Sequence, residues 1–275
     1  MDSYTIREAS TSIDDAEALS RVEAVTLGDS DLSANEMLAV LSQPGQYIYL
    51  AHDLDGTCIG MLASFDRHCE TGERLELDML GVVATWRGRG VARNLVGRAI
   101  DDGRSRGCTE YRAVVAVDNL ASRRVFERCG LASRGPGYRL MTRVFAGFAS
   151  VPLLPDGWAQ ESTPALAERD WAYPVGSGWC SAWEGIRLLD ASGKQAAVVA
   201  LQRVDTIAYS GYWIEGLWSQ NLASGQLALD VAAEYAKSCE LDEVGMLIPM
   251  GDDLWQAAMA AGYEHAGDYG VLVAG

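Results

Sequence analysis

A glycine-rich turn, R-G-R-G-V-A at residues 87–92, joins an extended apolar stretch to a long helical pattern. The first N–H groups of a helix have no intrahelical partner, and the helix dipole adds positive potential there. Glycines at positions 88 and 90 let a ligand approach the backbone closely, and Arg87 and Arg89 add positive charge. The pattern is typical of an anion site, most simply one for a diphosphate. A tight strand-to-helix turn without a ligand has the same local pattern.

Two common kinds of phosphate loop do not match this turn. The segment lacks the G-x-x-x-x-G-K-[ST] spacing of nucleoside-triphosphate sites, and it lacks the third glycine of the dinucleotide fingerprint. The phosphate group must therefore belong to another kind of molecule.

A second segment, N-L-A-S-R-R-V-F-E-R-C-G-L, follows at residues 119–131. Together the two segments resemble the signature motifs of the GNAT-type N-acetyltransferase superfamily, because residues 87–92 match R-x-x-G-x-A. The second motif, N-x-x-[AS]-x-x-x-Y-x-x-x-G-[FL], is matched at Asn119, Ser122, Gly130 and Leu131. Two motifs in this order are far more specific than either alone. The resemblance implies transfer of an acetyl group from acetyl-CoA to an amine, by direct attack within a ternary complex.

The resemblance also implies which residues contact acetyl-CoA. The backbones of Leu80 and Val82 are expected to hold the pantetheine arm and to polarise the thioester carbonyl, and the amides of residues 87–92 to hold the diphosphate. Main-chain N–H donors directed at a developing oxyanion contribute about 2.7–4 kcal/mol each in favourable cases. The implied cofactor contacts are Leu80, Val82, Val83, Arg87, Gly88, Arg89, Gly90, Val91, Ala92, Asn119, Ser122 and Phe126.

A general base is required, because only the neutral amine attacks the thioester. Asp78 stands where many members of the family carry an acidic residue, and it is the first candidate. Glu76 is the second, since residues two apart on a strand point to the same face. A solvated acidic strand edge has the same pattern.

Phe126 departs from the family pattern, which commonly has a tyrosine there, proposed to protonate the departing CoA thiolate. A phenyl ring cannot donate a proton, and three explanations remain. The thiolate leaves without help, since the pKa of a thiol is only about 8.5. Alternatively, Ser122 or Tyr138 supplies the proton. In the third explanation, the domain binds acyl-CoA without catalysing transfer.

Strands and helices are expected to alternate around these residues. In the first half, we predict strands at residues 4–9, 46–52, 58–66, 74–83, 109–117 and 138–145, and helices at residues 12–26, 33–41, 88–106 and 119–129. This order predicts an α/β (mixed α+β) fold, in which helices flank a mixed, mainly antiparallel twisted sheet.

The second half is predicted to repeat this fold. A chain of 275 residues is long enough for two domains. We place the boundary in the proline-containing stretch at residues 146–164, which gives a catalytic domain at residues 1–148 and a degenerate GNAT-like domain at residues 149–275. A shift of 132 residues places the C-G-L of residues 129–131 on the A-G-Y of residues 261–263. Any α/β chain can show such an order once.

The glycine-rich turn is not kept in the second copy. Ser219, Leu222 and Ser224 stand where the first copy has Arg87, Gly90 and Ala92. Because the glycine and the arginine are both lost, we predict that the second half does not bind CoA. Its expected role is to form one wall of the acceptor cleft of the first half.

Charge narrows the choice of acceptor. The formal net charge is −16 and the sequence pI is about 4.5, which argues against a nucleic-acid partner. Residues 151–275 hold 17 acidic residues against 5 basic ones. We therefore expect a small-molecule acceptor that is cationic or amino-sugar-like, as in aminoglycoside modification. A mycothiol-synthase-like transferase and a non-catalytic acyl-CoA-binding protein are the alternatives.

Other features of the composition indicate a cytoplasmic protein without metal or membrane. No run of about 18 apolar residues is present, and a monomer or homodimer is expected. Six cysteines without a C-x-x-C pair and three scattered histidines predict free thiols and no metal site. Tryptophans near acidic residues form either an ammonium pocket or core packing. These residues are Trp171, Trp179, Trp183, Trp213, Trp218, Asp170, Glu184 and Glu215.

Overall fold

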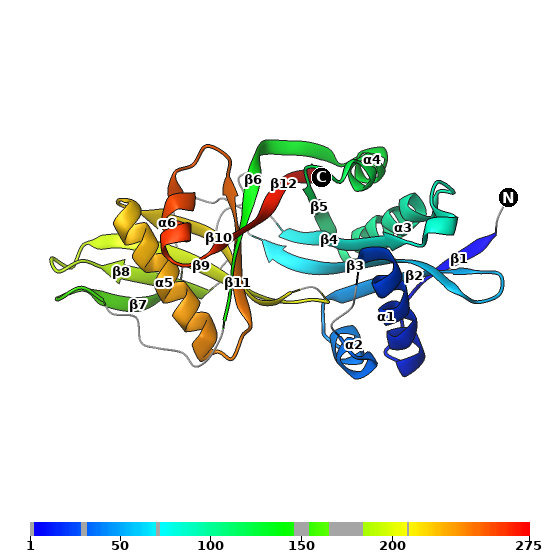
Figure 1. Cartoon of the computed structure of the whole chain (residues 1–275), viewed down its shortest axis with the longest axis horizontal. Helices are drawn as coiled ribbons and strands as arrows, with labels where there is room; N and C mark the ends of the chain where they lie inside the picture. The colour runs from blue at the N-terminus through cyan, green and yellow to red at the C-terminus, as the bar shows by residue number, and fades with distance from the viewer. Residues whose placement is uncertain (1–2, 29–31, 70–71, 146–153, 165–183, 208) are drawn as a thin grey trace.

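The computed structural model describes residues 3–28, 32–69, 72–145, 154–164, 184–207 and 209–275. Within them, twelve strands form one mixed sheet in the order β1-β2-β3-β4-β5-β12-β6-β11-β10-β9-β8-β7, and the two halves lie end to end along it (Figure 1). The strands of the first half are β1 (Tyr4–Glu8), β2 (Gln46–Asp53), β3 (Cys58–Cys69), β4 (Gly72–Val82), β5 (Cys108–Ala116) and β6 (Ala132–Val144). Those of the second half are β7 (Ala159–Pro164), β8 (Glu184–Leu189), β9 (Gln195–Asp205), β10 (Ser210–Ser219), β11 (Glu243–Pro249) and β12 (Glu264–Ala274).

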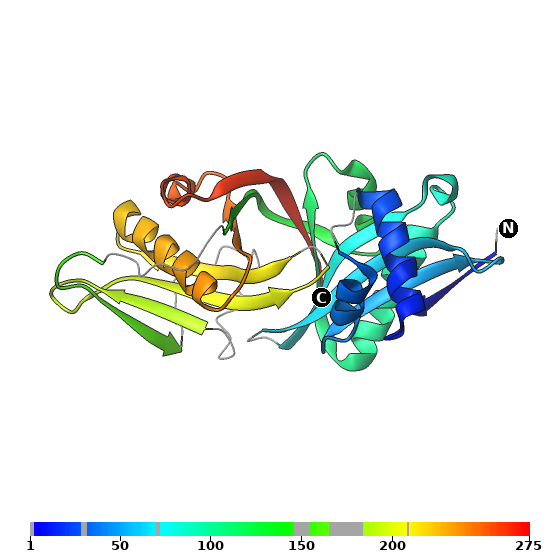
Figure 2. The ribbon, with the colours of Figure 1, turned by 60° about the horizontal axis from the view of Figure 1, so that its bottom comes forward.

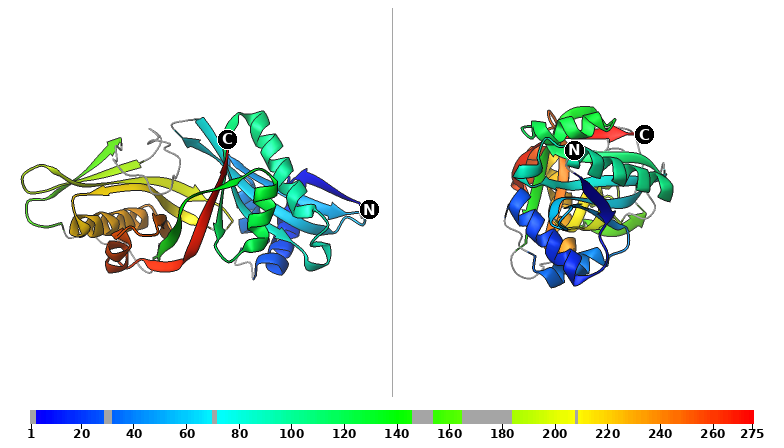
Figure 3. Two further views of the ribbon diagram at one scale, coloured as in Figure 1. Left: turned by 90° about the horizontal axis from the view of Figure 1, so that it is seen from above. Right: turned by 90° about the vertical axis from the view of Figure 1, so that its right-hand side faces the viewer.

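Helices cover both faces of the sheet in the first half. They are α1 (Ile13–Leu27), α2 (Ala34–Leu41), α3 (Val91–Arg106) and α4 (Leu120–Arg128), and a short 3₁₀ turn, η1 (Ala84–Trp86), precedes α3. One core packs α1 and α2 against Met61 and Ala63, and another packs α3 against Leu62 and Leu77. Because neighbouring residues of a strand point to opposite faces, the two helix pairs lie on opposite sides of the sheet (Figures 2 and 3). In the second half, α5 (Leu222–Ser238) and α6 (Leu254–Ala260) pack on the core formed by β8 to β11.

All ten elements predicted for the first half are present, with changes at their ends. Helix α3 begins at Val91, because Gly88 and Gly90 adopt positive φ values of 77° and 86° and belong to the turn. Strand β3 continues to Cys69 and strand β6 begins at Ala132, six residues before the predicted start. Added pairing with β12 extends β6 through a segment whose side chains are mostly exposed and therefore lack an apolar pattern.

The repeat is visible in the matching ends of α4 and α6. Gly130 and Gly262 follow these helices with φ values of 94° and 76°. The next N–H in each case, of Leu131 or Tyr263, returns to a carbonyl of the last turn at 3.1 or 3.0 Å. This glycine-terminated helix end is the same local structure in both copies, at the predicted shift of 132 residues.

The two halves also exchange strands. Strand β12, the last of the chain, lies between β5 and β6 and is antiparallel to both. Strand β6 in turn pairs with β11 of the second half. Leu272 of β12 is fully buried in the core of the first half, so the exchange contributes to packing as well as to hydrogen bonding. The predicted boundary between residues 148 and 149 lies outside the described residues.

A second contact between the halves comes from the turn between β9 and β10. Ile207 of this turn is buried in the cluster formed by α1, α2 and β3. Gln46 Nε2 at the start of β2 donates to the carbonyl of Asp205 at 2.9 Å. The turn thus lies against the first half next to the end of β3. In the parts of the chain that are described, none of the helices has the length and apolarity to cross a membrane.

Candidate active site

Strands β4 and β5 separate at the centre of the first half. They are paired in parallel only from Glu73 to Glu76 of β4, opposite Cys108 to Arg112 of β5. The opposite edge of β5 pairs with β12 over residues 111–116, so β12 does not cover this side of β4. In the described structure no strand pairs with this side of β4 beyond Glu76, so its main-chain groups there are open to a ligand.

A β-bulge interrupts β4 within this open segment. Leu62 of β3 faces Leu80, but Ser64 faces Leu77, so β4 has one residue more than β3 between these pairs. Asp78 and Met79 of β4 together lie opposite the single residue Ala63 of β3. Bulges bend a strand and redirect its side chains. Just beyond the bulge, helix α1 packs so closely on β4 that a Cβ at Gly81 would collide with the hydroxyl of Thr26.

A cavity of about 630 Å³ joins the open side of β4 to the start of α3 and one face of α4. Gly90 is the N-cap of α3, and no side chain caps this helix. The first N–H groups of α3 therefore remain available to an anion in the cavity. The lining residues are Thr26, Leu27, Leu80, Gly81, Val82, Trp86, Arg87, Gly88, Gly90, Val91, Ala92, Arg93, Asn119, Ala121, Ser122, Val125 and Arg128.

Nine of the twelve residues predicted to contact the cofactor line this cavity. The other three lie beside it. Val83 is half-buried, and its N–H extends the β3 pairing by donating to Ile59 at 3.0 Å. The guanidinium of Arg89 stacks on Trp86, 5.2 Å from the ring centroid. Phe126 is 2% exposed and belongs to the hydrophobic core under α4.

Sequence reasoning did not identify several residues of the cavity. Thr26 and Leu27 come from the end of α1, which no motif connects with the turn. Ala121, Val125 and Arg128 are spaced as one face of α4, and this helical spacing was a usable signal. Arg87 has a structural role as well, because its Nε donates to the carbonyl of Val82 at 3.0 Å and ties the turn to β4.

Glu76 is held between two arginines. Its Oε1 accepts from Arg74 Nε at 2.7 Å, and its Oε2 accepts from Arg112 Nε at 2.8 Å. Burial acts to raise the pKa of Glu76, but Arg112 and Arg74 outweigh it and hold the pKa at about 2. A carboxylate of such low basicity, with both oxygens in ion pairs, is a weak proton acceptor near neutral pH.

Asp78 has a different environment at the bulge. Its side chain is exposed to solvent but has many protein atoms around it, and it does not line the 630 Å³ cavity. The resulting loss of hydration raises the pKa of Asp78 to about 6, and the charge of Glu76 acts in the same direction. A hydrogen bond from Thr206 and the charge of Arg67 oppose this rise. Thr206 belongs to the turn between β9 and β10, so the second half contacts this carboxyl group directly.

A buried ion pair joins the halves beside these carboxylates. Arg67 of β3 is 3% exposed and pairs through Nη1 with Glu215 of β10, which is fully buried. Glu215 occupies a register shift of β10, between Ile214 and Gly216. Each half therefore places an acidic residue at an irregularity of the strand that precedes its long helix.

The two residues proposed as substitutes for a tyrosine acid lie in different places. Ser122 lines the cavity, and its N–H donates to Oδ1 of Asn119, the N-cap of α4, at 3.1 Å. Tyr138 is 2% exposed and packs with Leu247 and Val271 in a separate cluster where β6, β11 and β12 meet.

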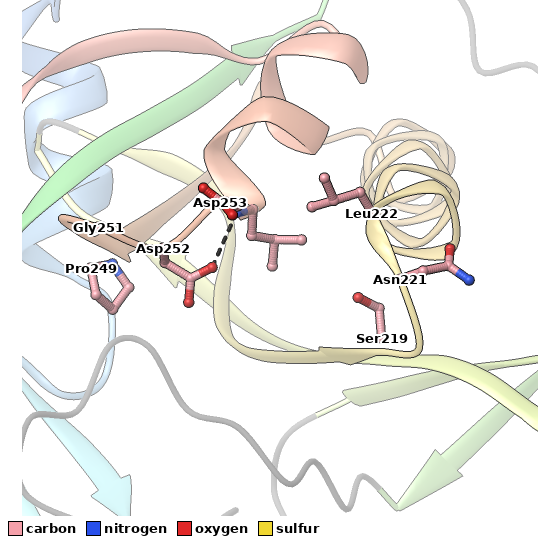
Figure 4. Close-up of a pocket in the computed structure, with 8 residues that line it drawn as sticks. Ser219, Asn221, Leu222, Pro249, Gly251, Asp252 and Asp253 are labelled. Atoms are coloured by element: carbon pink, nitrogen blue, oxygen red, sulfur yellow. Dashed lines mark hydrogen bonds between the residues drawn. The ribbon is translucent and has the colours of Figure 1, made fainter.

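The second half has its own pocket, of about 520 Å³, at the position that corresponds to the first cavity (Figure 4). Asn221 caps α5 there: its Oδ1 accepts from the N–H of Ser224 at 3.0 Å, while Ser224 Oγ accepts from the N–H of Asn221 at 3.3 Å. Asp252 and Asp253 also line the pocket, and Asp252 Oδ1 accepts from Leu254 N–H at 3.1 Å. The first N–H groups of α5 are thus partly satisfied by this cap, and the two aspartates make the pocket negatively charged.

The residues considered for an aromatic ammonium pocket do not come together where they are described. Glu184 accepts hydrogen bonds from the hydroxyls of Tyr212 and Tyr235, at 2.7 and 2.5 Å, while Glu215 is paired with Arg67. Trp213 packs edge-on against Tyr209 instead. Trp218 is half-buried on β10, and the candidates Trp171, Trp179, Trp183 and Asp170 lie outside the described residues.

Comparisons with known proteins agree with this geometry. Residues 13–131 match the model of the Acetyltransferase (GNAT) family. A GCN5-related N-acetyltransferase from Sphaerobacter thermophilus has a similar structure, with a TM-score of 0.63 and 18% identity over 98% of this chain and 95% of that one. A tandem GNAT protein from the clavulanic acid biosynthesis pathway gives a TM-score of 0.58 and 14% identity, over 99% and 98% of the two chains.

A third solved structure, an acetyltransferase from Pyrococcus horikoshii described as putative, gives a TM-score of 0.56 at 13% identity, over 99% of this chain and 89% of that one. A search of curated proteins gave no significant match. Residues 13–131 therefore form a domain that matches the GNAT family model. The chain as a whole has the fold of a tandem GNAT protein.

Proposed function

We propose that this protein is an acetyl-CoA-dependent N-acetyltransferase that acts on a primary amine of a small cationic molecule. The observation that carries the proposal is one continuous cavity with an uncapped helix N-terminus at α3 and the open, bulged segment of β4 beside it. An anion-binding end and an unpaired strand edge match the two halves of CoA, a diphosphate and a chain of amides.

The cofactor is proposed to bind along this cavity. The N–H groups from Gly88 to Ala92 hold the diphosphate, with Arg87 adding charge. The amides of the pantetheine arm pair with the main chain of Leu80 and Val82, and a main-chain N–H of β4 donates to the thioester carbonyl. That donor is fixed before the reaction, so it stabilises the oxyanion of the tetrahedral intermediate without reorganisation.

Asp78 is proposed as the general base. With a pKa of about 6 it is mostly ionised at pH 7, yet basic enough to accept a proton from the acceptor ammonium, directly or through water. The neutral amine then attacks the carbonyl carbon, the C–N bond forms and the C–S bond breaks. The electron pair of the broken bond leaves on the CoA sulfur. Ser122, which lines the cavity, is the proposed proton donor to this sulfur, and solvent is the alternative.

The second half is proposed to complete the acceptor side rather than to bind CoA. Thr206 contacts Asp78, and Arg67 beside it is paired with Glu215 of the second half. The carboxylate of Asp78 and the net negative charge of the second half favour an ammonium-bearing acceptor. An aminoglycoside or another amino sugar has this chemistry.

Thiol release from acetyl-CoA over a panel of amines tests the proposal. The full chain is assayed with amino sugars, polyamines and amino acids, and CoA binding is measured separately by calorimetry. Turnover that depends on the amine and is lost in Asp78→Asn supports the proposal. CoA binding without turnover on any amine favours the non-catalytic alternative, which gains support from the absence of a hydroxyl at Phe126. Absence of CoA binding contradicts both.

A further inference from the structure

The cavity of the first half has a positively charged side that the proposed chemistry does not use. Arg93, in the first turn of α3, and Arg128, at the end of α4, both line it. Within the described structure, neither guanidinium has a hydrogen-bond or ion-pair partner. Arg98 of the same helix α3, in contrast, pairs with Asp102 at 2.7 Å. In a chain with a net charge of −16, two guanidinium groups without a carboxylate partner at one cavity indicate an anionic ligand.

The two arginines lie at the same end of the cavity. Cys129, next to Arg128, donates through its Sγ to the carbonyl of Arg93 at 3.7 Å, so the end of α4 lies against the first turn of α3. Ala121 and Val125 precede Arg128 on one face of α4 and line the cavity as well. This face therefore presents a small apolar surface followed by a cation.

CoA has a third phosphate, and the turn before α3 does not account for it. In the proposed binding mode the diphosphate lies at the N-terminus of α3, and the thioester lies towards the bulge at Asp78, where the reaction occurs. The adenosine then extends to the other end, where the 3′-phosphate on its ribose carries close to two negative charges near neutral pH. A dianion of this kind requires cations of its own.

We infer that Arg93 and Arg128 form a subsite for the 3′-phosphate of CoA, with Ala121 and Val125 packing against the adenosine. The inference rests on the proposed function, because it assumes that CoA is the ligand of the cavity. It adds that the protein selects CoA over the same molecule without its 3′-phosphate.

Calorimetric titration of the full chain with CoA and with dephospho-CoA, at one fixed ionic strength, tests the subsite. We expect CoA to bind at least about tenfold more tightly, as appropriate for one or two charge-assisted hydrogen bonds. Arg128→Gln and Arg93→Gln should each reduce this ratio, and the double variant should bring it close to one. The affinity for dephospho-CoA should stay unchanged within a factor of about two.

Arg124→Gln is the matched control. Arg124 lies on α4 as well and has the same charge, but it does not line the cavity. Its substitution should leave the ratio of the two affinities unchanged. Equal binding of CoA and dephospho-CoA by the unaltered protein overturns the subsite while leaving the proposed function intact. An equal loss in Arg124→Gln also overturns it, since long-range charge then explains the preference. Binding of neither compound contradicts the proposed function itself.

Discussion

The two halves carry the same long helix after the same kind of strand, but the helix starts differ. Helix α3 begins at a glycine with positive φ and no side-chain cap. Helix α5 begins at Asn221 in an extended conformation, with Asn221 and Ser224 capping each other. A reciprocal cap stabilises a helix by satisfying the donors that an anion would otherwise bind. The first N–H groups of α3 thus remain open in the first half, whereas those of α5 are partly satisfied by side chains in the second half.

The charges around the two helix starts differ in the same sense. Arg87 and Arg93 line the first cavity, whereas Asp252 and Asp253 line the second pocket. Carboxylates at a site repel a diphosphate, and salt screens this repulsion only beyond a Debye length of about 8 Å. The two copies of the fold therefore differ in the cap of the long helix and in the charge around its start.

Replacement of the bulge residue in the first half should have the largest effect on activity. Asp78→Asn removes the proposed base while keeping the size of the side chain. We expect the rate of amine-dependent thiol release to fall by about 10²–10⁴-fold. The dissociation constant for CoA, measured by calorimetry, should not change. Retention of activity above a tenth of the original would show that another group accepts the proton.

Replacement of the acidic residue at the register shift of β10 should reduce stability. Glu215→Gln leaves Arg67 charged and buried without its carboxylate, and removal of one partner from a buried pair costs about 3–5 kcal/mol. Urea unfolding measures this cost. The double variant Arg67→Met with Glu215→Leu is the control, because replacement of the whole pair by apolar residues is often neutral. An unchanged free energy of unfolding in Glu215→Gln would contradict the role of this pair.

The uncapped turn can be tested with one glycine from each half. Gly90→Val forces a β-branched residue into a left-handed conformation, at a cost of about 1–2 kcal/mol, and places a side chain where the diphosphate is proposed to lie. We expect CoA affinity to fall by about tenfold or more. Gly251→Val is the matched control, since Gly251 has a φ of 93°, open space around it and a position in the second pocket. A similar loss of affinity in both variants would indicate general destabilisation.

The pH dependence of the reaction should show the smallest effect, through Thr206. Because protonated Asp78 cannot act as a base, kcat/KM should fall tenfold per pH unit below about pH 6. Thr206→Val removes a hydrogen bond that favours the carboxylate, so the pKa rises and the fall begins at higher pH, by less than about one unit. Thr206→Ser should restore the original profile. A profile that does not move would exclude this contact between the halves.

Features that depend on neighbours along the chain could be predicted from the sequence. The turn at residues 87–92, the helices beside it and the residues along β4 are set by glycines, helical spacing and alternation, and they lie where expected. The ion pairs of Glu76 could not be foreseen, because Arg112 reaches it only when β5 pairs with β4. The contact of Thr206 with Asp78 requires the same long-range knowledge.

The place of β12 could not be predicted for a related reason. Its apolar run, with Val271, Leu272 and Val273 all buried, fits any position between two strands of a covered sheet. A sequence pattern fixes which face is buried but not which strands are the neighbours. The exchange between the halves is therefore a property of the topology alone.

The position of β12 has a consequence for how the protein is made. Residues 111–116 obtain their antiparallel neighbour from residues 269–274, which are synthesised long after them. In the first half, one edge of β5 therefore stays uncovered until residues 269–274 have been made. Contacts so distant along the chain close slowly, and an uncovered strand edge invites pairing with other chains. Deletion of residues 264–275 should thus damage the first half, although it lies far from them in the sequence.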